Sequence, residues 1–242
     1  VCTGAVVMPI HRYDDALLKF QQEPATVLYL DTCILLDIIR SPIRDTIAAE
    51  SVQFAKFLLE RSNHKPKSLW LVTSETVALE WEEHADEIVK EVEREILKLE
   101  SKRSHMLTAA KAATEIDYLH GQAVNRINLA QTLKAISKSV LDTCIVIPPE
   151  NEHSLAAMKR VKKYRAPAKR GKAEPKDCEI YEVFLSLCRD LQEKEMKLIF
   201  ASSNTNDYGE KNSGGIEQEL SAVKAKYANC WNWVNVILEE RS

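Results

Sequence analysis

The sequence predicts an α/β protein: a three-layer α/β/α arrangement around a central, mostly parallel sheet, extended by a helical insertion. Short apolar runs alternate with helical patterns, which is typical of parallel strands joined by crossover helices. The 242 residues are 45% hydrophobic and 29% charged. These ordinary values exclude a disordered polymer, a collagen-like repeat and a coiled-coil rod. We interpret residues 1–242 as a single domain.

The expected strands are short apolar runs bounded by polar residues. The three clearest runs are Val27–Leu30, Leu69–Val72 and Leu198–Ala201. A fourth candidate strand, Trp233–Leu238, lies near the end of the sequence. Helical patterns follow the first run over Ile34–Ile39 and over about Thr46–Arg61, and helix resumes at Ser74 after the second run.

The stretch from about Glu82 to Lys138 has a different composition. It is rich in Glu, Lys, Ala and Leu, and it contains one glycine and no proline. This pattern predicts two or three long helices, with breaks near Ser101–Ser104 and at Gly121. No linker marks it as independent, so we expect residues 82–138 to be a helical insertion packed on the α/β core.

A basic segment stands out in a chain whose net charge is −3. It holds eight Lys or Arg between residues 159 and 172 and no acid. It is either a solvated helix face followed by a loop, or a surface that binds phosphate groups. Its members are Lys159, Arg160, Lys162, Lys163, Arg165, Lys169, Arg170 and Lys172.

The cysteines and the apolar runs bear on location. The six cysteines form no C-x-x-C pair, which argues against a zinc ribbon or a disulfide framework and suits a reducing, cytoplasmic environment. No run of 18 apolar residues is present, so we expect no contact with a membrane. The opening Val1–Ile10 lacks the basic and long apolar regions of a signal peptide.

Four carboxylates occupy unusual positions. Asp31 and Asp207 each follow a predicted strand. Asp177 lies in line with the apolar face of the helix it opens, and Glu80 flanks the apolar face of the helix after the second strand. Taken singly, each has an ordinary explanation as a cap, a turn or a surface residue.

Four other acids lack such placement, and we expect them on the surface. They are Asp14, Asp15, Asp37 and Asp45.

Together, the four unusual carboxylates predict a metal site. In parallel sheets, ligands gather outside the carboxyl ends of the strands, and Asp31, Glu80, Asp177 and Asp207 are all expected at that edge. Carboxylates held close together repel one another, so they must take up protons or share a cation. All-oxygen ligands favour Mg²⁺ or Mn²⁺ over zinc or copper.

The order of these residues resembles the PIN-domain nucleases, and most closely their larger bacterial members. The shared pattern is an acid ending the first strand, a Glu after the second, an Asp opening a later helix, and a Ser/Thr-x-x-x-Asp-aromatic loop, here Ser203 to Tyr208. A basic Arg-Gly pair, Arg170-Gly171, precedes the third acid. The resemblance covers residues 26–99 and 158–238, and it departs at Cys33, where the family often has Asn or Ser.

The resemblance implies metal-dependent hydrolysis of phosphodiester bonds, most readily in single-stranded RNA, leaving a 5′-phosphate and a 3′-hydroxyl. Asp31, Glu80, Asp177 and Asp207 would be the catalytic residues that hold one or two Mg²⁺ or Mn²⁺ ions, which activate a water and neutralise charge on the phosphate. Whether Asn204 or Asp207 takes the fourth position stays open.

Other residues would support the site or bind the nucleic acid. The supporting residues around the metal would be Thr32, Ser203 and Asn204. Those gripping the phosphate backbone would be Arg165, Lys169, Arg170, Lys172 and Lys176.

Several alternatives remain at this point. A haloacid-dehalogenase-like phosphatase also has an acid after its first strand, but it needs a second Asp where this chain has Cys33. A non-catalytic PIN-like module that binds RNA or a protein is a second alternative. A flap-type DNA nuclease, with the helical insertion as an arch, is a third. The added helices also suit a homodimer or an inhibitor such as an antitoxin, in a toxin, defence or RNA-processing role.

Overall fold

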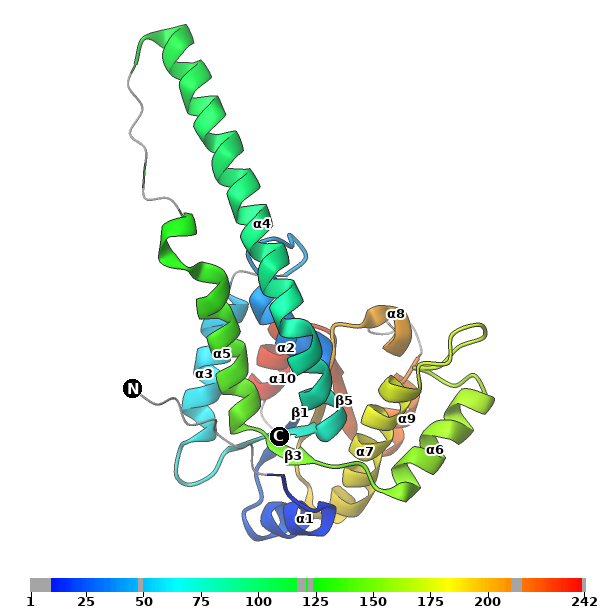
Figure 1. The fold of residues 1–242 in the computed structure, drawn as a ribbon. Coiled ribbons are helices and arrows are strands. Elements are labelled where there is room, and N and C mark those ends of the chain that lie inside the picture. The colour runs from blue at the N-terminus through cyan, green and yellow to red at the C-terminus, as the bar shows by residue number, and fades with distance from the viewer. Residues whose placement is uncertain (1–9, 48–49, 117–120, 122–123, 210–214, 241–242) are drawn as a thin grey trace.

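The computed structural model describes residues 10–47, 50–116, 121, 124–209 and 215–240, and its strands form one parallel sheet (Figure 1). The strand order is β3-β2-β1-β4-β5, and every pairing between neighbours is parallel. This confirms the predicted α/β fold. The strands are β1 (Thr26–Leu30), β2 (Leu69–Ser74), β3 (Ile145–Ile147), β4 (Leu198–Ala201) and β5 (Ala225–Ala228).

The strand order creates a switch point between β1 and β4. From β1 the chain builds outward through β2 to β3, and it then crosses to the other side of β1 to add β4 and β5. The connections that leave β1 and β4 therefore diverge. In open parallel sheets, the crevice outside the carboxyl ends of two such strands is the usual place for a ligand.

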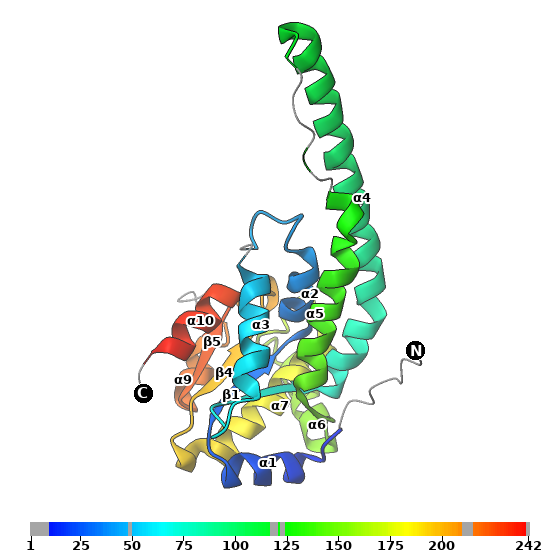
Figure 2. The same cartoon turned by 90° about the vertical axis from the view of Figure 1, so that its left-hand side faces the viewer.

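Helices cover both faces of the sheet (Figures 1 and 2). Helices α2, α3, α4 and α5 pack together on one side, and α1, α6 and α7 pack on the other. The helices are α1 (Tyr13–Gln22), α2 (Thr32–Arg40), α3 (Ser51–Ser62), α4 (Glu75–Thr114), α5 (Leu129–Thr143), α6 (Asn151–Lys162), α7 (Pro175–Leu191), α8 (Thr205–Tyr208), α9 (Glu217–Ala222) and α10 (Trp231–Glu239), with short 3₁₀ turns at Val124–Ile127 and Gln192–Lys194.

An aromatic cluster holds α7 against the centre of the sheet. Tyr29 of β1 and Phe200 of β4 have ring centroids 5.9 Å apart, and Phe184 of α7 lies 5.3 Å from each. All three side chains are fully buried. Burying an aromatic side chain contributes roughly 1.5–3 kcal/mol. The cluster therefore anchors the helix that carries Asp177 next to the two strands at the switch point.

Helix α4 begins inside the fold and ends outside it. Its 40 residues correspond to about 60 Å at 1.5 Å per residue. Its buried residues all lie between Val77 and Ile96, and the rest of the helix projects from the molecule (Figures 1 and 2). The predicted break near Ser101–Ser104 is wrong. The surrounding Lys, Arg, Leu and Ala are strong helix formers, and serine costs only a few tenths of a kcal/mol in a helix.

The predicted strand at Trp233–Leu238 is also wrong, because these residues belong to α10. Trp231, Val234 and Leu238 are buried while the residues between them are mostly exposed. This spacing of three and four is the helical period. The strand that follows β4 at one edge of the sheet is β5, which was missed in the sequence and in which only Lys226 is exposed.

Some element boundaries and the burial of Asp37 also differ from the prediction. Helix α3 begins at Ser51 rather than near Thr46. The sequence interpretation missed α1 and the three-residue β3. Asp37 was expected on the surface, yet it is only 8% exposed. It lies on α2, a short helix that is buried on nearly every side.

Gly121 lies in the connection between α4 and α5, as predicted. Of the helices described, none is both long and apolar enough to cross a membrane.

Candidate active site

Asp31 lies at the switch point, directly after β1. It is 3% exposed, and its Oδ2 accepts a hydrogen bond of 2.5 Å from the hydroxyl of Ser202, which directly follows β4. Burial raises the pKa of Asp31 to about 6, although the hydrogen bond from Ser202 opposes this shift. This hydrogen bond links the two strands of the switch point. The raised pKa means that the Asp31 carboxyl loses its proton less readily than an ordinary aspartate.

Asp177 lies in the first turn of α7. Pro175 at the first helical position suits this start because proline has no N–H to leave unpaired. Burial, followed by the nearby charges of Asp31 and Glu174, raises the pKa of Asp177 to about 8. The charge of Asp31 raises the pKa of Asp177 only at short range. Asp177 of α7 therefore lies close to Asp31, at the carboxyl end of β1.

Asp207 reaches the same place from the turn after β4. Asn204 Nδ2 donates to Asp177 Oδ2 at 3.1 Å and to Asp207 Oδ2 at 3.0 Å, and so bridges the two acids. Lys172 Nζ donates to Asp207 Oδ2 at 2.6 Å. Burial would raise the pKa of Asp207, but the hydrogen bonds from Lys172 and Asn204 lower it below its ordinary value.

Glu80 approaches from the first turns of α4. Thr32 Oγ1 donates to Glu80 Oε2 at 2.7 Å, and Lys176 Nζ lies 3.4 Å from Glu80 Oε1. Thr32 directly follows Asp31, so this hydrogen bond ties α4 to the start of α2. Glu80 is one of the charges that raise the pKa of both Asp31 and Asp177.

A fifth acid, Glu174, was missed in the sequence. One carboxylate oxygen from each of Glu174, Asp177 and Asp207 lies within 4.8 Å of the others, which is close enough to share one cation. Glu174 adopts a left-handed backbone conformation, with φ of 42°, just before α7. An acid followed by proline at a helix start was the available signal. We call Asp31, Glu80, Glu174, Asp177 and Asp207 the acidic edge.

The basic segment divides into two parts. Lys169 and Lys172 lie in the loop before α7 and both contact Asp207, and Arg170 is exposed beside them. Arg160 and Arg165 instead contact Glu219 of α9. Arg160 is 4% exposed and also pairs with Glu182 at 2.8 Å.

The segment after β4 presents alternate residues to two sides. Ser202 and Asn204 contact the acidic edge. Ser203, which was expected beside the metal, lines a pocket together with Asp37 instead, and its hydroxyl acts to lower the pKa of Asp37. The sequence predicted a serine hydroxyl near Asp31, but it assigned this role to Ser203 rather than to Ser202. A one-residue difference reverses the direction of a side chain in extended backbone.

The acidic edge has the chemistry of a divalent-cation site. Asp207 Oδ1 is buried and accepts no hydrogen bond from the residues described, although Lys169 Nζ lies 3.3 Å away. Two of the carboxyls, Asp31 and Asp177, have raised pKa values. A hard cation such as Mg²⁺ or Mn²⁺ prefers oxygen ligands and would relieve their repulsion.

The sheet order and the acids at its switch point define a PIN-like α/β protein. A family model described as PIN domain matches residues 28–208, which is more than half of the chain. The chain therefore belongs to the PIN-domain family, whose members are generally nucleases that use divalent metal ions. No curated protein and no solved structure matches it.

Proposed function

We propose that this protein is a divalent-metal-dependent nuclease that hydrolyses phosphodiester bonds of single-stranded RNA and leaves a 5′-phosphate. The observation that carries the proposal is the convergence of Asp31, Glu80, Asp177 and Asp207 from four separate elements. A stabilising role alone does not account for this cluster, because burial raises the pKa of two of its members and makes their charged forms unfavourable.

The carboxylates have distinct roles in this proposal. Asp31, Glu80, Asp177 and Asp207 hold the metal, and Glu174, which lies close enough to Asp177 and Asp207 to share a cation with them, is an additional ligand. The Asn204 side-chain nitrogen donates to both Asp177 and Asp207. This favours Asp207 as the fourth acidic ligand and Asn204 as the residue that positions it.

Hydrolysis also requires groups that orient the substrate. When bound, the divalent ion supplies an activated water and neutralises charge on the phosphate. Lys169, Arg170 and Lys172 line the approach to Asp177 and bind the backbone without reading its sequence. Lys176 lies at the same entrance, beside Glu80. Arg165, held by Glu219, binds the strand further out.

RNA is proposed rather than a DNA flap because of the helical insertion. An arch that binds DNA strands would be expected to be basic. Residues 82–138 instead contain nine Lys or Arg and ten Asp or Glu. An inhibitor protein or a second copy of the chain remains a candidate partner for these helices.

The proposal is tested by a gel assay with labelled single-stranded RNA and DNA, in Mn²⁺, Mg²⁺ or EDTA. We expect wild-type protein to cleave RNA only with metal. Asp31→Asn and Asp177→Asn should each lower the rate at least ~10²-fold, because losing one ligand disturbs the entire metal site.

Asp14→Asn is the matched control, because Asp14 is exposed on α1 and its change should leave the rate unaltered. Equal rates in all four proteins would mean that the acidic edge is not the active site. Binding of RNA without cleavage in any metal would favour the non-catalytic module.

A further inference from the structure

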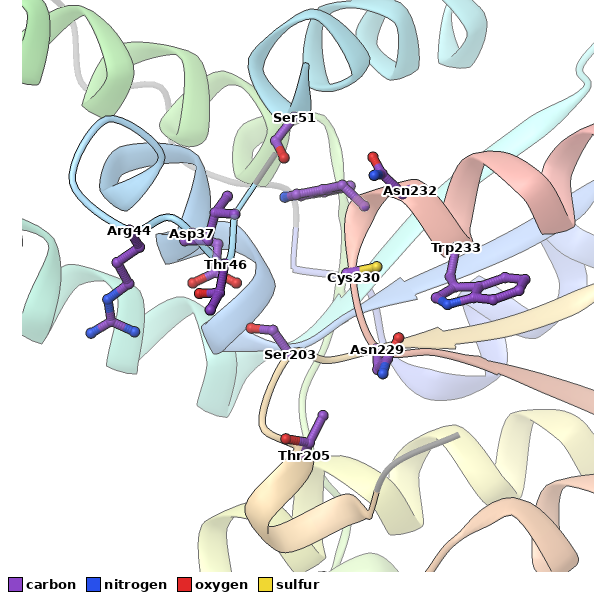
Figure 3. Close-up of a pocket in the computed structure, with 12 residues that line it drawn as sticks. Asp37, Arg44, Thr46, Ser51, Ser203, Thr205, Asn229, Cys230, Asn232 and Trp233 are labelled. Atoms are coloured by element: carbon purple, nitrogen blue, oxygen red, sulfur yellow. The ribbon is translucent and has the colours of Figure 1, made fainter. Parts of the chain in front are cut away.

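A concave site lies beside the segment that follows β4 (Figure 3). It has a volume of about 490 Å³, within the range of roughly 300–1,000 Å³ that small-molecule sites occupy. Its walls come from the end of α2, the turn that follows α2, the segment after β4 and the start of α10. We call it the α10 pocket. Asp37, Ser203, Asn229 and Trp233 are among its lining residues.

The α10 pocket and the acidic edge share a wall. Ser203 and Thr205 line the pocket, while Ser202 and Asn204, their neighbours in the chain, contact Asp31 and Asp177. Figure 3 shows Ser203 on the segment after β4 and Thr205 at the start of α8. The two sites therefore lie against the same short segment of the chain, and a strand bound at the acidic edge passes next to the α10 pocket.

Two buried polar atoms of the pocket wall have no partner among the residues described. They are Oδ1 of Asn229 and Nε1 of Trp231. Trp231 is only 2% exposed. A buried polar group without a hydrogen bond is unfavourable. A polar ligand in the pocket would supply a donor to Asn229 Oδ1 and an acceptor to Trp231 Nε1.

The pocket also offers an aromatic surface and charged groups. Trp233 lines it and is 36% exposed. Arg44 and Asp37 approach from the other side (Figure 3). Proteins recognise single-stranded RNA by stacking unpaired bases on aromatic side chains and by hydrogen bonds to the base edges. Arginine, carboxylate and amide groups around a tryptophan match that recognition.

We infer that the α10 pocket binds one nucleobase of the RNA strand, next to the phosphate that is cleaved. The base stacks on Trp233, and its edge hydrogen-bonds to the amide of Asn229 and the indole N–H of Trp231. The pocket thereby gives the nuclease a preference for one base, while the lysines of the neighbouring loop bind any backbone. This inference rests on the proposed function for the identity of the strand.

The test measures binding without cleavage. Asp177→Asn protein in EDTA is titrated with four RNA pentamers, each containing a single kind of base, and with an abasic pentamer of the same charge. We expect at least one base to bind roughly tenfold tighter than the abasic pentamer, since stacking of a base on an aromatic contributes about that much. Adding Trp233→Ala should remove this gain.

Two further variants make the result decisive. Val236→Ala changes an exposed residue of the same helix and should leave binding unaltered. Asn229→Ala should reduce the difference among the four bases while leaving the abasic pentamer unaffected. The inference is overturned if the abasic pentamer binds as well as the others, or if Trp233→Ala and Val236→Ala behave alike. Absence of cleavage by wild-type protein would contradict the proposed function only, because this assay needs no metal.

Discussion

The molecule buries charge in two places, and it treats them in opposite ways. In the first, Arg160 is 4% exposed and donates to Glu182 and Glu219, each at 2.8 Å. Its guanidinium also lies over the ring of Tyr181, 4.7 Å from the centroid. We call these residues, with Arg165 at the exposed end, the Arg160 network. Burial lowers the pKa of Arg160, but its hydrogen bonds to Glu219 and Glu182 outweigh this and raise it.

The second place is the acidic edge, where Asp31 and Asp177 have no buried cation as a partner among the residues described. The side chains that hydrogen-bond Asp31 and Asp177 there are a hydroxyl and an amide. The lysines of the site contact Asp207 and Glu80 instead, and they are 46–59% exposed. This fold can therefore pair a buried acid with a buried arginine. It does not do so at the switch point, where no buried arginine or lysine of the described residues pairs with Asp31 or Asp177.

The largest effect on stability is expected in the Arg160 network. Arg160→Met would leave Glu182 buried without its guanidinium partner, and removing one member of a buried pair costs about 3–5 kcal/mol. The free energy of unfolding in urea measures this loss. Arg189→Met is the control, because Arg189 lies 3.9 Å from Glu182 and is 55% exposed. We expect it to cost less than about 1 kcal/mol. Equal losses would show that Arg160 is no different from a surface ion pair.

A smaller effect is expected from the exposed cations of the acidic edge. Changing Lys169, Arg170 and Lys172 together to Ala should weaken binding of single-stranded RNA. It should also flatten the dependence of log K on log[salt] by up to ~0.7 for each phosphate that the variant no longer binds. Titrations between about 50 and 200 mM salt measure the slope.

The matched control for that triple variant is a second one of equal charge at the end of α6, built from the exposed residues Lys159 and Lys162 and from Lys163, which directly follows the helix. If both triple variants have the same slope, the loop before α7 makes no special contact with RNA.

A third effect concerns the charge of Asp177, which accepts a hydrogen bond from Asn204 but pairs with no cation among the residues described. Its pKa is about 8 in the folded protein against an ordinary value of 3.8, so the folded state holds a proton that the unfolded chain has released. Stability without metal therefore falls as the pH rises from about 4 to 8. At pH 8 in EDTA, Asp177→Asn should melt at least about 2–4 °C above wild type, which corresponds to a gain of at least about 1 kcal/mol at this size.

The Tm difference should shrink at pH 6 and reverse when Mn²⁺ is added, since the metal stabilises the wild-type protein. A variant that is less stable than wild type at pH 8 in EDTA would mean that Asp177 is already neutralised in the folded protein.

Much of the candidate site was visible in the sequence because it depends on local order. Asp31 follows an apolar run, and Asp177 lies in line with the buried face of its helix. The sequence did not predict the places of Ser202 and Glu174 in the site, nor the burial of Asp37. The first differs from Ser203 only in the direction of its side chain, and the others depend on neighbours that lie far away in the chain.

By itself, the sequence determined the alternation of strands and helices and the acids at their ends, because hydrophobic periodicity and helix starts act over a few residues. It did not determine which charges are paired. Arg160 and Lys172 belong to one basic segment, yet one is buried with Glu219 and the other lies exposed beside Asp207. Only the tertiary structure decided this, because the energy of a charge depends on the depth and the partners that packing provides.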